Sequence, residues 1–251
     1  KVFDVTRSSV SQSAVNNNDY SFDIYGTYTK KFGDNHNLVA TIGNTIFKEY
    51  GNGLFATGYD VPNNSWDFAD ISLANGAPPA GTVPVSSYVY DERRLSYFGR
   101  LQYDYKGKYL LSYIARRDQS SNFGPTYSVA YFNSILGGWI ISDEAFFENV
   151  KTINFLKLRA SYGTLGNDNT GGGSIYRSLL NGEAEYVLNG TLITGTAPGV
   201  IANPEAKWES DTKFDLGLDA KFFDSKLEFI FDYYNNTRKD LLIVGIPVSG
   251  I

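Results

Sequence analysis

Three aromatic residues, Tyr59, Trp66 and Phe68, have the types and the spacing that could bind a ligand. They fall within residues 51–91, a polar stretch rich in Gly, Asn and Pro, which predicts a long loop. Aromatic rings on an exposed loop can stack on sugar rings or anchor a partner protein. The same rings can instead pack the loop onto itself or onto a neighbouring loop. The three residues are therefore candidates for substrate or partner binding, with both interpretations open.

No run of residues predicts a metal or phosphate site. Residues 167–171, Asn-Asp-Asn-Thr-Gly, resemble a calcium loop but contain one carboxylate and lack the downstream bidentate Glu. We expect ordinary turn chemistry there. The Gly-rich residues 171–174 lack the strand-to-helix setting of a phosphate loop, so we expect a loop tip.

Catalytic chemistry is not indicated either. Two carboxylate pairs, Glu183 with Glu185 and Asp143 with Glu144, are close in sequence, which does not establish the spatial separation that a glycosidase needs. His36 is the only histidine and Cys is absent, which argues against a His-based triad, a disulfide or a thiolate metal site. The chain is not predicted to be an enzyme, and no catalytic residue, metal or cofactor is expected.

Composition narrows the classes of partner. The net charge is −5 and the pI about 5.0, so no basic patch for nucleic acid is expected. Mean hydropathy is −0.26, and no run of 18 apolar residues predicts a transmembrane helix. Tyr and Phe, with 19 and 17 copies, supply nearly all of the aromatic content and favour strands.

Long runs of alternating apolar and polar residues dominate the chain. In residues 212–222 the even-numbered positions from Phe214 onward are apolar, and the odd-numbered positions are Lys, Asp or Gly. Such runs exceed the roughly 9–11 residues that cross a hydrocarbon core, whereas strands of soluble domains average about 5–6. A membrane barrel would place the apolar face on lipid and the charged face in its lumen. The alternative is a soluble or surface-attached β-sandwich that binds glycans or acts as an adhesin.

The connections between these runs are of two alternating kinds. Antiparallel barrels of outer membranes have short turns at one end and long loops at the other. The predicted short turns are residues 33–35, 106–108 and 223–225, and the predicted long connections are residues 51–91, 119–126 and 166–207. This rhythm favours the barrel. Trp139 and Trp208 then belong to an interfacial aromatic girdle or to structural packing rather than to a ligand site.

Several sequence blocks together resemble one family of proteins. The blocks are residues 94–111 (RLSYFGRLQYDYKGKYLL), 116–125 (RRDQSSNFGP), 131–132 with 138–144 (GWIISDE) and 146–147, 156–163 (LKLRASYG) with 166–168, 203–204 with 207–209 (KWE), and 232–242 (DYYNNTRKDLL). In this order and spacing they resemble the SusC/RagA-like TonB-dependent transporters of Bacteroidetes. Residues 1–92 contain none of these blocks and resemble the family only in their general character.

The resemblance implies an all-β fold, an antiparallel transmembrane β-barrel. We expect residues 1–251 to be a partial arc of a 22-stranded plugged barrel, contributing about eight or nine strands. No plug, TonB box or C-terminal strand is recognised, so the chain is expected to be a middle-to-late portion of a longer protein.

The resemblance also implies a function and partners. The complete protein is expected to import an oligosaccharide or a peptide across the outer membrane of a Gram-negative bacterium. Its expected partners are a SusD-like surface lipoprotein, the TonB complex through the missing N-terminal part, and outer-membrane lipid.

Overall fold

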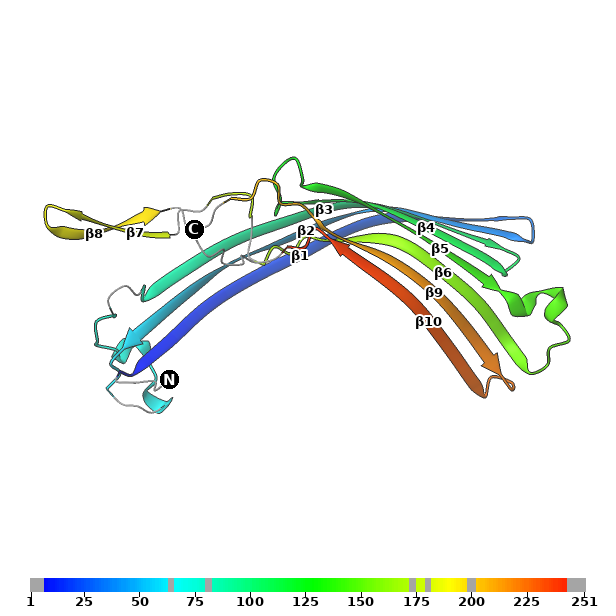
Figure 1. Ribbon diagram of the computed structural model, residues 1–251, viewed down its shortest axis with the longest axis horizontal. Coiled ribbons are helices and arrows are strands. Elements are labelled where there is room, and N and C mark those ends of the chain that lie inside the picture. The colour runs from blue at the N-terminus through cyan, green and yellow to red at the C-terminus, as the bar shows by residue number, and fades with distance from the viewer. Residues whose placement is uncertain are drawn as a thin grey trace. The chain divides into compact units, whose positions relative to one another are not determined.

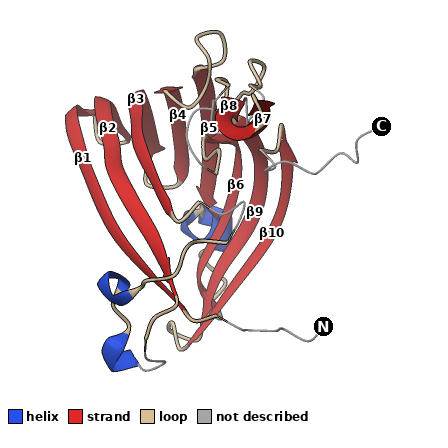
Figure 2. Ribbon diagram, turned by 90° about the vertical axis from the view of Figure 1, so that its left-hand side faces the viewer, coloured by secondary structure: helices blue, strands red, loops and turns tan. Residues whose placement is uncertain are grey.

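The structure is a computed structural model that describes residues 7–62, 66–79, 83–171, 175–178, 182–197 and 202–242. Eight strands form one antiparallel sheet in the order β1-β2-β3-β4-β5-β6-β9-β10 (Figures 1 and 2). They are β1 (Ser9–Phe32), β2 (His36–Tyr59), β3 (Val85–Tyr105), β4 (Tyr109–Ser120), β5 (Val129–Ile140), β6 (Ile153–Asn167), β9 (Glu209–Phe222) and β10 (Leu227–Lys239). Four 3₁₀ turns complete the helical content of these residues: η1 (Trp66–Phe68), η2 (Ile71–Leu73), η3 (Ile141–Asp143) and η4 (Ala145–Phe147).

The chain divides into two compact units. The first comprises Lys1–Tyr20 and Lys48–Glu92, and therefore contains one end of each of the strands β1, β2 and β3 together with η1 and η2. The second comprises Ser21–Phe47 and Arg93–Ile251, and contains the remainder of those strands and all later elements.

The register of the second unit gives its sheet one apolar and one polar face. Arg159 of β6 lies opposite Gly217 of β9, and Gly217 lies opposite Asp232 of β10. Because side chains alternate along each strand, residues in register share a face. The apolar face of β6, β9 and β10 consists of Leu156, Leu158, Ala160, Tyr162, Phe214, Leu216, Leu218, Ala220, Phe229, Phe231 and Tyr233. The opposite face carries the charged and polar residues Lys157, Arg159, Ser161, Lys213, Asp215, Asp219, Lys221, Glu228 and Asp232, together with Ile230 opposite Asp219 and Tyr234 opposite Asp215, and we call it the polar face.

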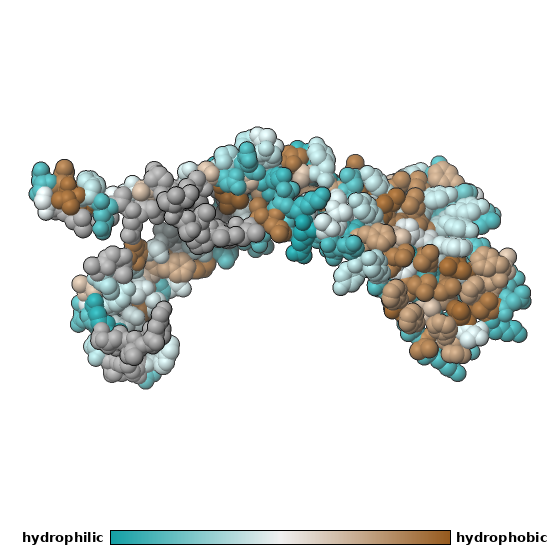
Figure 3. All heavy atoms as spheres, viewed as in Figure 1, coloured by the Kyte–Doolittle hydropathy of each residue, from teal (hydrophilic) through white to brown (hydrophobic). Residues whose placement is uncertain are grey.

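The apolar face is not covered by any other described element. Phe229, Phe231 and Tyr233 of β10 are each at least half exposed, and Figure 3 shows hydrophobic side chains gathered where β9 and β10 lie. Among the described residues, only five apolar side chains are buried. An exposed apolar surface of this size marks a membrane or protein contact.

The connections alternate largely as expected. Tight turns join β1 to β2, β3 to β4 and β9 to β10, as predicted, and positive φ angles at Lys106 and Gly107 and at Phe223, Asp224 and Ser225 form the last two of these turns. The connection from β5 to β6 is longer and contains η3 and η4.

No helix of the described residues is long and apolar enough to cross a membrane.

The connection between β6 and β9 contains a hairpin that the sequence analysis missed. Its strands, β7 (Gly182–Leu188) and β8 (Thr191–Ala197), form a separate two-stranded sheet. Asn189 and Gly190 make the turn, and both have positive φ. Asn-Gly is the preferred pair for a two-residue hairpin, so the signal was present in the sequence.

The first strands are much longer than expected, which corrects the predicted loop at residues 51–91. Strand β2 continues to Tyr59 and β3 begins at Val85, so the connection comprises only residues 60–84. Strands β1 and β2 each have 24 residues and β3 has 21, about twice the number needed to cross a hydrocarbon core. The alternation of apolar and polar residues weakens where both faces of a strand meet water. The strand residues beyond the length that lipid requires therefore have a loop-like sequence.

The described part of the sheet has two outer strands, β1 and β10. A complete barrel has no edge strands, because its first and last strands pair. The ordered antiparallel pairing and the two-faced strands confirm the predicted all-β antiparallel sheet.

Candidate functional site

Tyr59, the first residue of the aromatic candidate set, is not a loop residue. It ends β2, and the guanidinium of Arg7 lies over its ring at 5.4 Å from the centroid. Arg7 donates hydrogen bonds to both carboxylate oxygens of Asp60, at 2.9 and 2.6 Å, and to the Ala77 carbonyl at 2.8 Å. The hydrogen bond from Arg7 holds the pKa of the Asp60 carboxyl below its ordinary value. One face of the Tyr59 ring is therefore already covered by a cation.

Trp66 and Phe68 lie together in η1, within the connection between β2 and β3. The side chain of Trp66 is 95% exposed, so its ring is open to a ligand. The backbone of Phe68 belongs to η1, but its side chain lies outside the described part of the structure. After η1, Asp70 accepts a hydrogen bond from the Ser72 amide at 2.9 Å and so caps η2, which lowers the pKa of the Asp70 carboxyl.

A four-residue ion cluster occupies the centre of the polar face. Arg159 of β6 lies 3.2 Å from a carboxylate oxygen of Asp215, 3.2 Å from one of Asp219 and 2.5 Å from one of Asp232. We call these residues the Arg159 cluster. One cation thereby holds three carboxylates from two further strands, which places charge on this face and away from the apolar one.

Gly217 makes the Arg159 cluster possible. It lies directly opposite Arg159, and a Cβ added there would overlap the Arg159 guanidinium. A side chain at this position would push the guanidinium off its three carboxylates. Alternation predicted the charges on this face, but not their convergence on a single arginine.

Replacing Arg159 with Gln should destabilise the complete protein, because three neighbouring carboxylates would lose their shared cation. Arg159 is about three-quarters buried, and hydrogen bonds to charged groups contribute roughly 1.5–3 kcal/mol each. Its three carboxylate partners are partly exposed and regain water when the arginine is lost, so we expect a net loss of only about 2–3 kcal/mol. Chemical denaturation in detergent measures this loss. The control is Arg159→Lys, which keeps the charge and should recover part of the stability. Equal stability of Arg159→Gln and the parent protein would contradict the role of the cluster.

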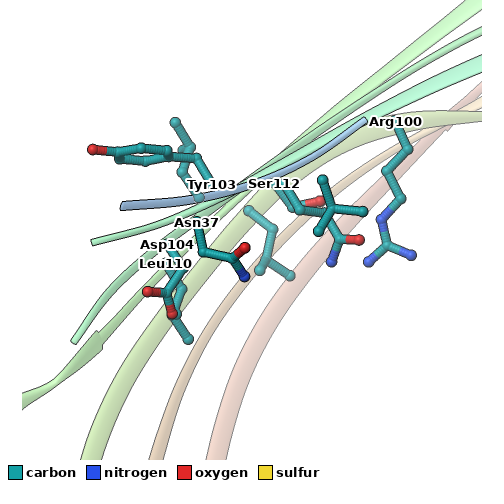
Figure 4. A pocket seen from close by; sticks show the side chains of 10 residues that line it. Asn37, Arg100, Tyr103, Asp104, Leu110 and Ser112 are labelled. Carbon is teal, nitrogen blue, oxygen red and sulfur yellow. The ribbon is translucent and has the colours of Figure 1, made fainter. Parts of the chain in front are cut away.

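A hollow of about 290 Å³ lies among β2, β3, β4 and β5, close to the turns at residues 33–35 and 106–108 (Figure 4). Asn37, Arg100 and Asp104 extend to one side of the sheet there, and Tyr103 lies on the other side. Ser112 is buried within the lining. Among the described residues, the Ser112 hydroxyl and the Asn37 side-chain oxygen have no hydrogen-bond partner. The hollow therefore offers hydrogen-bonding groups to whatever occupies this side of the sheet.

The bases of two long connections share a small buried core, which the sequence analysis did not identify. Trp208, just before β9, packs against Phe123 at a centroid distance of 5.5 Å and against Phe132 at 5.7 Å. Its indole N–H donates to the Ser128 carbonyl at 3.0 Å. We call Phe123, Phe132, Ala206 and Trp208 the loop anchor. Structural packing, one of the two roles expected for Trp208, is thereby confirmed.

Asp168 lies in the same region as the loop anchor, and its contacts show the structural role of residues 167–171, the run that resembles a calcium loop. Its carboxylate lies 2.8 Å from the Arg94 guanidinium, and its carbonyl accepts a hydrogen bond from the Asn122 side chain at 3.1 Å. Asn167 and Asn169 cap local turns by accepting from backbone amides at 3.1 and 3.0 Å. Turn chemistry is therefore confirmed here, and the described residues contain no group of three potential metal ligands.

A row of aromatic rings lies near the tight turns. His36, Tyr105, Tyr109, Trp139 and Phe146 follow one another at centroid distances of 4.8, 6.1, 6.4 and 6.5 Å. The Trp139 indole N–H donates to the Glu144 carboxylate at 3.0 Å. Amphipathic rings at one level of a sheet are typical of the boundary between lipid and water.

Glu144 should make the β5–β6 connection sensitive to acid. Hydrogen bonds from Tyr109 and Trp139, followed by the charge of Lys108, lower the pKa of the Glu144 carboxyl. A lowered pKa means that this stabilisation is complete above the ordinary pKa of a glutamate and is lost as the pH falls through the lowered value. We expect the thermal stability of Glu144→Gln to fall less steeply than that of the parent protein between about pH 6 and pH 3. Parallel curves would contradict this assignment.

Comparisons with known proteins agree with this architecture. The family described as "TonB dependent receptor-like, beta-barrel" matches residues 3–250. TonB-dependent receptor P3 of Formosa agariphila is 37% identical over 219 residues, which are 87% of this chain and 21% of that protein. TonB-dependent receptor SusC of Bacteroides thetaiotaomicron is 32% identical over 233 residues, 91% of this chain and 22% of that protein.

Solved structures resemble this one over nearly its whole length. The RagAB peptide transporter superposes with a TM-score of 0.77 at 26% identity, covering 94% of this chain and 25% of that chain. The RagAB peptide importer in its open-open state superposes with a TM-score of 0.75 at 25% identity. The chain thus spans about a fifth of the length of the curated relatives and a quarter of the matching solved chains.

Proposed function

Because this chain belongs to the TonB-dependent receptor β-barrel family, we propose that it forms part of the wall through which a complete transporter imports a nutrient. Members of this family are outer-membrane proteins of Gram-negative bacteria, and they are transporters rather than enzymes. The observation that carries the proposal is the two-faced sheet: an apolar face that no described element covers lies opposite a face held together by ion pairs.

The two faces of the sheet suit different surroundings. Leucine and phenylalanine side chains of β9 and β10 suit contact with lipid, and the Arg159 cluster suits a water-filled or plugged lumen. The alternative of a soluble β-sandwich requires a second sheet against the apolar face. Among the described residues the eight strands form a single layer, and the hairpin of β7 and β8 is the only other sheet. The structure therefore favours the barrel wall.

The relatives support a proposal for the partners and the substrate. The matching RagAB structures are of a peptide transporter, and SusC is a curated relative. We propose a SusD-like surface lipoprotein at the long connections, the TonB complex as energy source, and an oligosaccharide or a peptide as substrate. No nucleic acid is proposed as a partner.

An uptake experiment tests this function. Cells of the native host that carry or lack the complete gene are supplied with fluorescent oligosaccharides and peptides, with and without an intact TonB system. We expect accumulation of a member of one class only when both the gene and TonB are present. Accumulation that is independent of TonB, or of the gene, would contradict the proposal.

Within the connection between β2 and β3, we propose that Trp66 and Phe68 contact the substrate or the partner. Trp66 has an open ring, whereas the Tyr59 ring is partly covered by Arg7. Trp66→Ala should lower partner or substrate affinity about tenfold and leave the melting temperature unchanged. Tyr59→Ala serves as the control, since it should loosen the strand end with a smaller effect on binding. Unchanged affinity of Trp66→Ala would remove Trp66 from the site.

A further inference from the structure

A lysine lies on the apolar face of β1, close to the tight turn that joins β1 to β2. The Lys30 ammonium lies 4.8 Å from the centre of the Phe32 ring, so both side chains extend to the same side of the strand. Lys30 is exposed, and it therefore places a charge at the end of an apolar surface. The apolar residues of β1 that share this face are each more than half exposed, namely Phe22, Ile24 and Tyr28.

A second exposed lysine lies beside it, in the β3–β4 turn. The Lys106 ammonium lies 5.4 Å from the centre of the Tyr105 ring, which lies 4.8 Å from the His36 ring. His36 shares a hydrogen bond of 2.6 Å with the Tyr103 hydroxyl. The backbone amide of Lys106 also donates to the Asn35 carbonyl at 2.6 Å, so the β1–β2 and β3–β4 turns lie side by side.

These side chains lie on the face that meets lipid in the proposed barrel wall. The hydroxyls of Thr27 and Thr41 are 3.1 Å apart, so the odd-numbered residues of β1 and β2 share one face. Asn37 is one of these odd-numbered residues, and Tyr103 lies on the other side of the sheet from it (Figure 4). Lys30, an even-numbered residue, therefore shares the apolar face with Tyr103.

The two lysines bring positive charge that the described residues do not neutralise. Neither Lys30 nor Lys106 forms an ion pair within the described part of the chain. Of the nearby carboxylates, Asp104 accepts a hydrogen bond from a backbone amide of its own turn at 2.8 Å, and Glu144 already binds a lysine at 3.5 Å. Asp34, in the β1–β2 turn, forms no ion pair. Even with Asp34 counted, the two lysines leave an excess of positive charge.

We propose that Lys30 and Lys106 bind the headgroup of an anionic phospholipid, whose acyl chains lie on the apolar face. Strands β1 and β3 flank β2 and are therefore about 10 Å apart, a gap that two lysine side chains and a headgroup can span. Long lysine side chains reach from an apolar surface to the headgroup level. Because the short turns of outer-membrane barrels face the periplasm, the lipid belongs to the periplasmic leaflet.

The charge of the headgroup decides which phospholipid this site prefers. An anionic headgroup neutralises the lysines, whereas a zwitterionic headgroup brings a cation of its own that they repel. The site therefore favours phosphatidylglycerol over phosphatidylcholine. This inference goes beyond nutrient import and rests on the proposed barrel wall.

The test measures lipid enrichment beside the two lysines in the complete protein. A fluorophore is attached to Asn35→Cys, in the β1–β2 turn, after any cysteines elsewhere in the complete protein are replaced. Vesicles of dioleoylphosphatidylcholine contain the same small fraction of nitroxide-labelled phosphatidylglycerol or phosphatidylcholine, and the nitroxide quenches the fluorophore. We expect the association constant from quenching to be about fivefold or more higher for phosphatidylglycerol. Lys30→Gln and Lys106→Gln should each lower this ratio, and the double variant should bring it to about one.

Lys31→Gln is the matched control. It removes the same charge from the neighbouring residue, which lies on the opposite face of β1, so the ratio at Asn35→Cys should not change. A fluorophore at Ser225→Cys, in the β9–β10 turn, supplies a second control because it reports a distant position. Its ratio should be the same in the parent protein and in both lysine variants.

Two results would overturn the inference: equal quenching by the two lipids in the parent protein, or the same loss of preference in Lys31→Gln as in Lys30→Gln. Relief of the quenching by inorganic phosphate would assign the lysines to a free anion and would overturn it too. Each of these results leaves the barrel wall standing, because the protein has inserted. Failure of the complete protein to insert into any of the vesicles would remove both the site and the wall.

Discussion

Replacing Phe123 with Ala should lower the local free energy of unfolding of the β4–β5 connection by about 3–5 kcal/mol. Phe123 is only 2% exposed, and its ring packs on Trp208, which in turn contacts Phe132. The substitution removes the largest fully buried side chain of the described residues and leaves a cavity where little else is buried. Two long connections share this core, so both should loosen together.

Hydrogen–deuterium exchange of the complete protein measures this effect. Amides of residues 120–128 and 202–208 should exchange faster in Phe123→Ala, because the Trp208 hydrogen bond to Ser128 depends on the same packing. Phe223→Ala, at an exposed phenylalanine in the β9–β10 turn, is the matched control and should leave these amides unchanged. Faster exchange in one connection alone would show that the loop anchor does not couple the two.

Replacing Leu216 with Arg should cost about 2–4 kcal/mol of barrel stability, because the new charge would face hydrocarbon near the middle of β9. Leu216 lies opposite Ala160 of β6 and Tyr233 of β10, so its neighbours on both sides belong to the apolar face. An arginine there has no carboxylate on its own face in either neighbouring strand.

Ser161→Arg is the matched control for Leu216→Arg. Ser161 occupies the polar face directly opposite Asp215, so an arginine there meets water and a carboxylate. Folding yield into vesicles and denaturant titration should separate the two variants clearly. Equal loss of stability in both would show that the two faces of the sheet do not meet different solvents.

The faces of the later strands were predictable from the sequence. The alternation around Leu216 and Asp215 assigned both faces of β9 correctly, because lipid on one side imposes a strict period of two. The turns at residues 106–108 and 223–225 were also predictable, since each interrupts that period. The family resemblance placed these strands in a transporter barrel, and the family match confirms it.

The ends of the first strands were not predictable in this way. Polar residues such as those at 16–18 continue β1 well beyond the length that lipid requires. Without an apolar face, a strand in water looks like a loop in sequence, which is why Tyr59 was misassigned. The pairing that extends these strands is between distant residues, such as Ser11 with Thr57 at 2.9 Å.

The sequence also did not predict which distant side chains come into contact. Nothing in the local sequence around Phe123 or Trp208 indicates that they meet, because 84 residues intervene and both lie in polar connections. The same holds for Arg159 and its three carboxylates, which depend on the register of three strands. Register follows from the pairing of whole strands, and this is a property of the fold.

Single cysteines placed one at a time along β9, from Lys213 to Lys221, test the central claim most directly. The chain contains no Cys of its own, so each label reports one position of this segment. Spin labels on the complete protein in membranes should be accessible to oxygen at even-numbered positions and to a water-soluble nickel chelate at odd-numbered positions. That alternation is the predicted result for a barrel wall between lipid and lumen. Two results would contradict the claim: accessibility to the chelate at every position, or accessibility that does not alternate along the strand for either reagent.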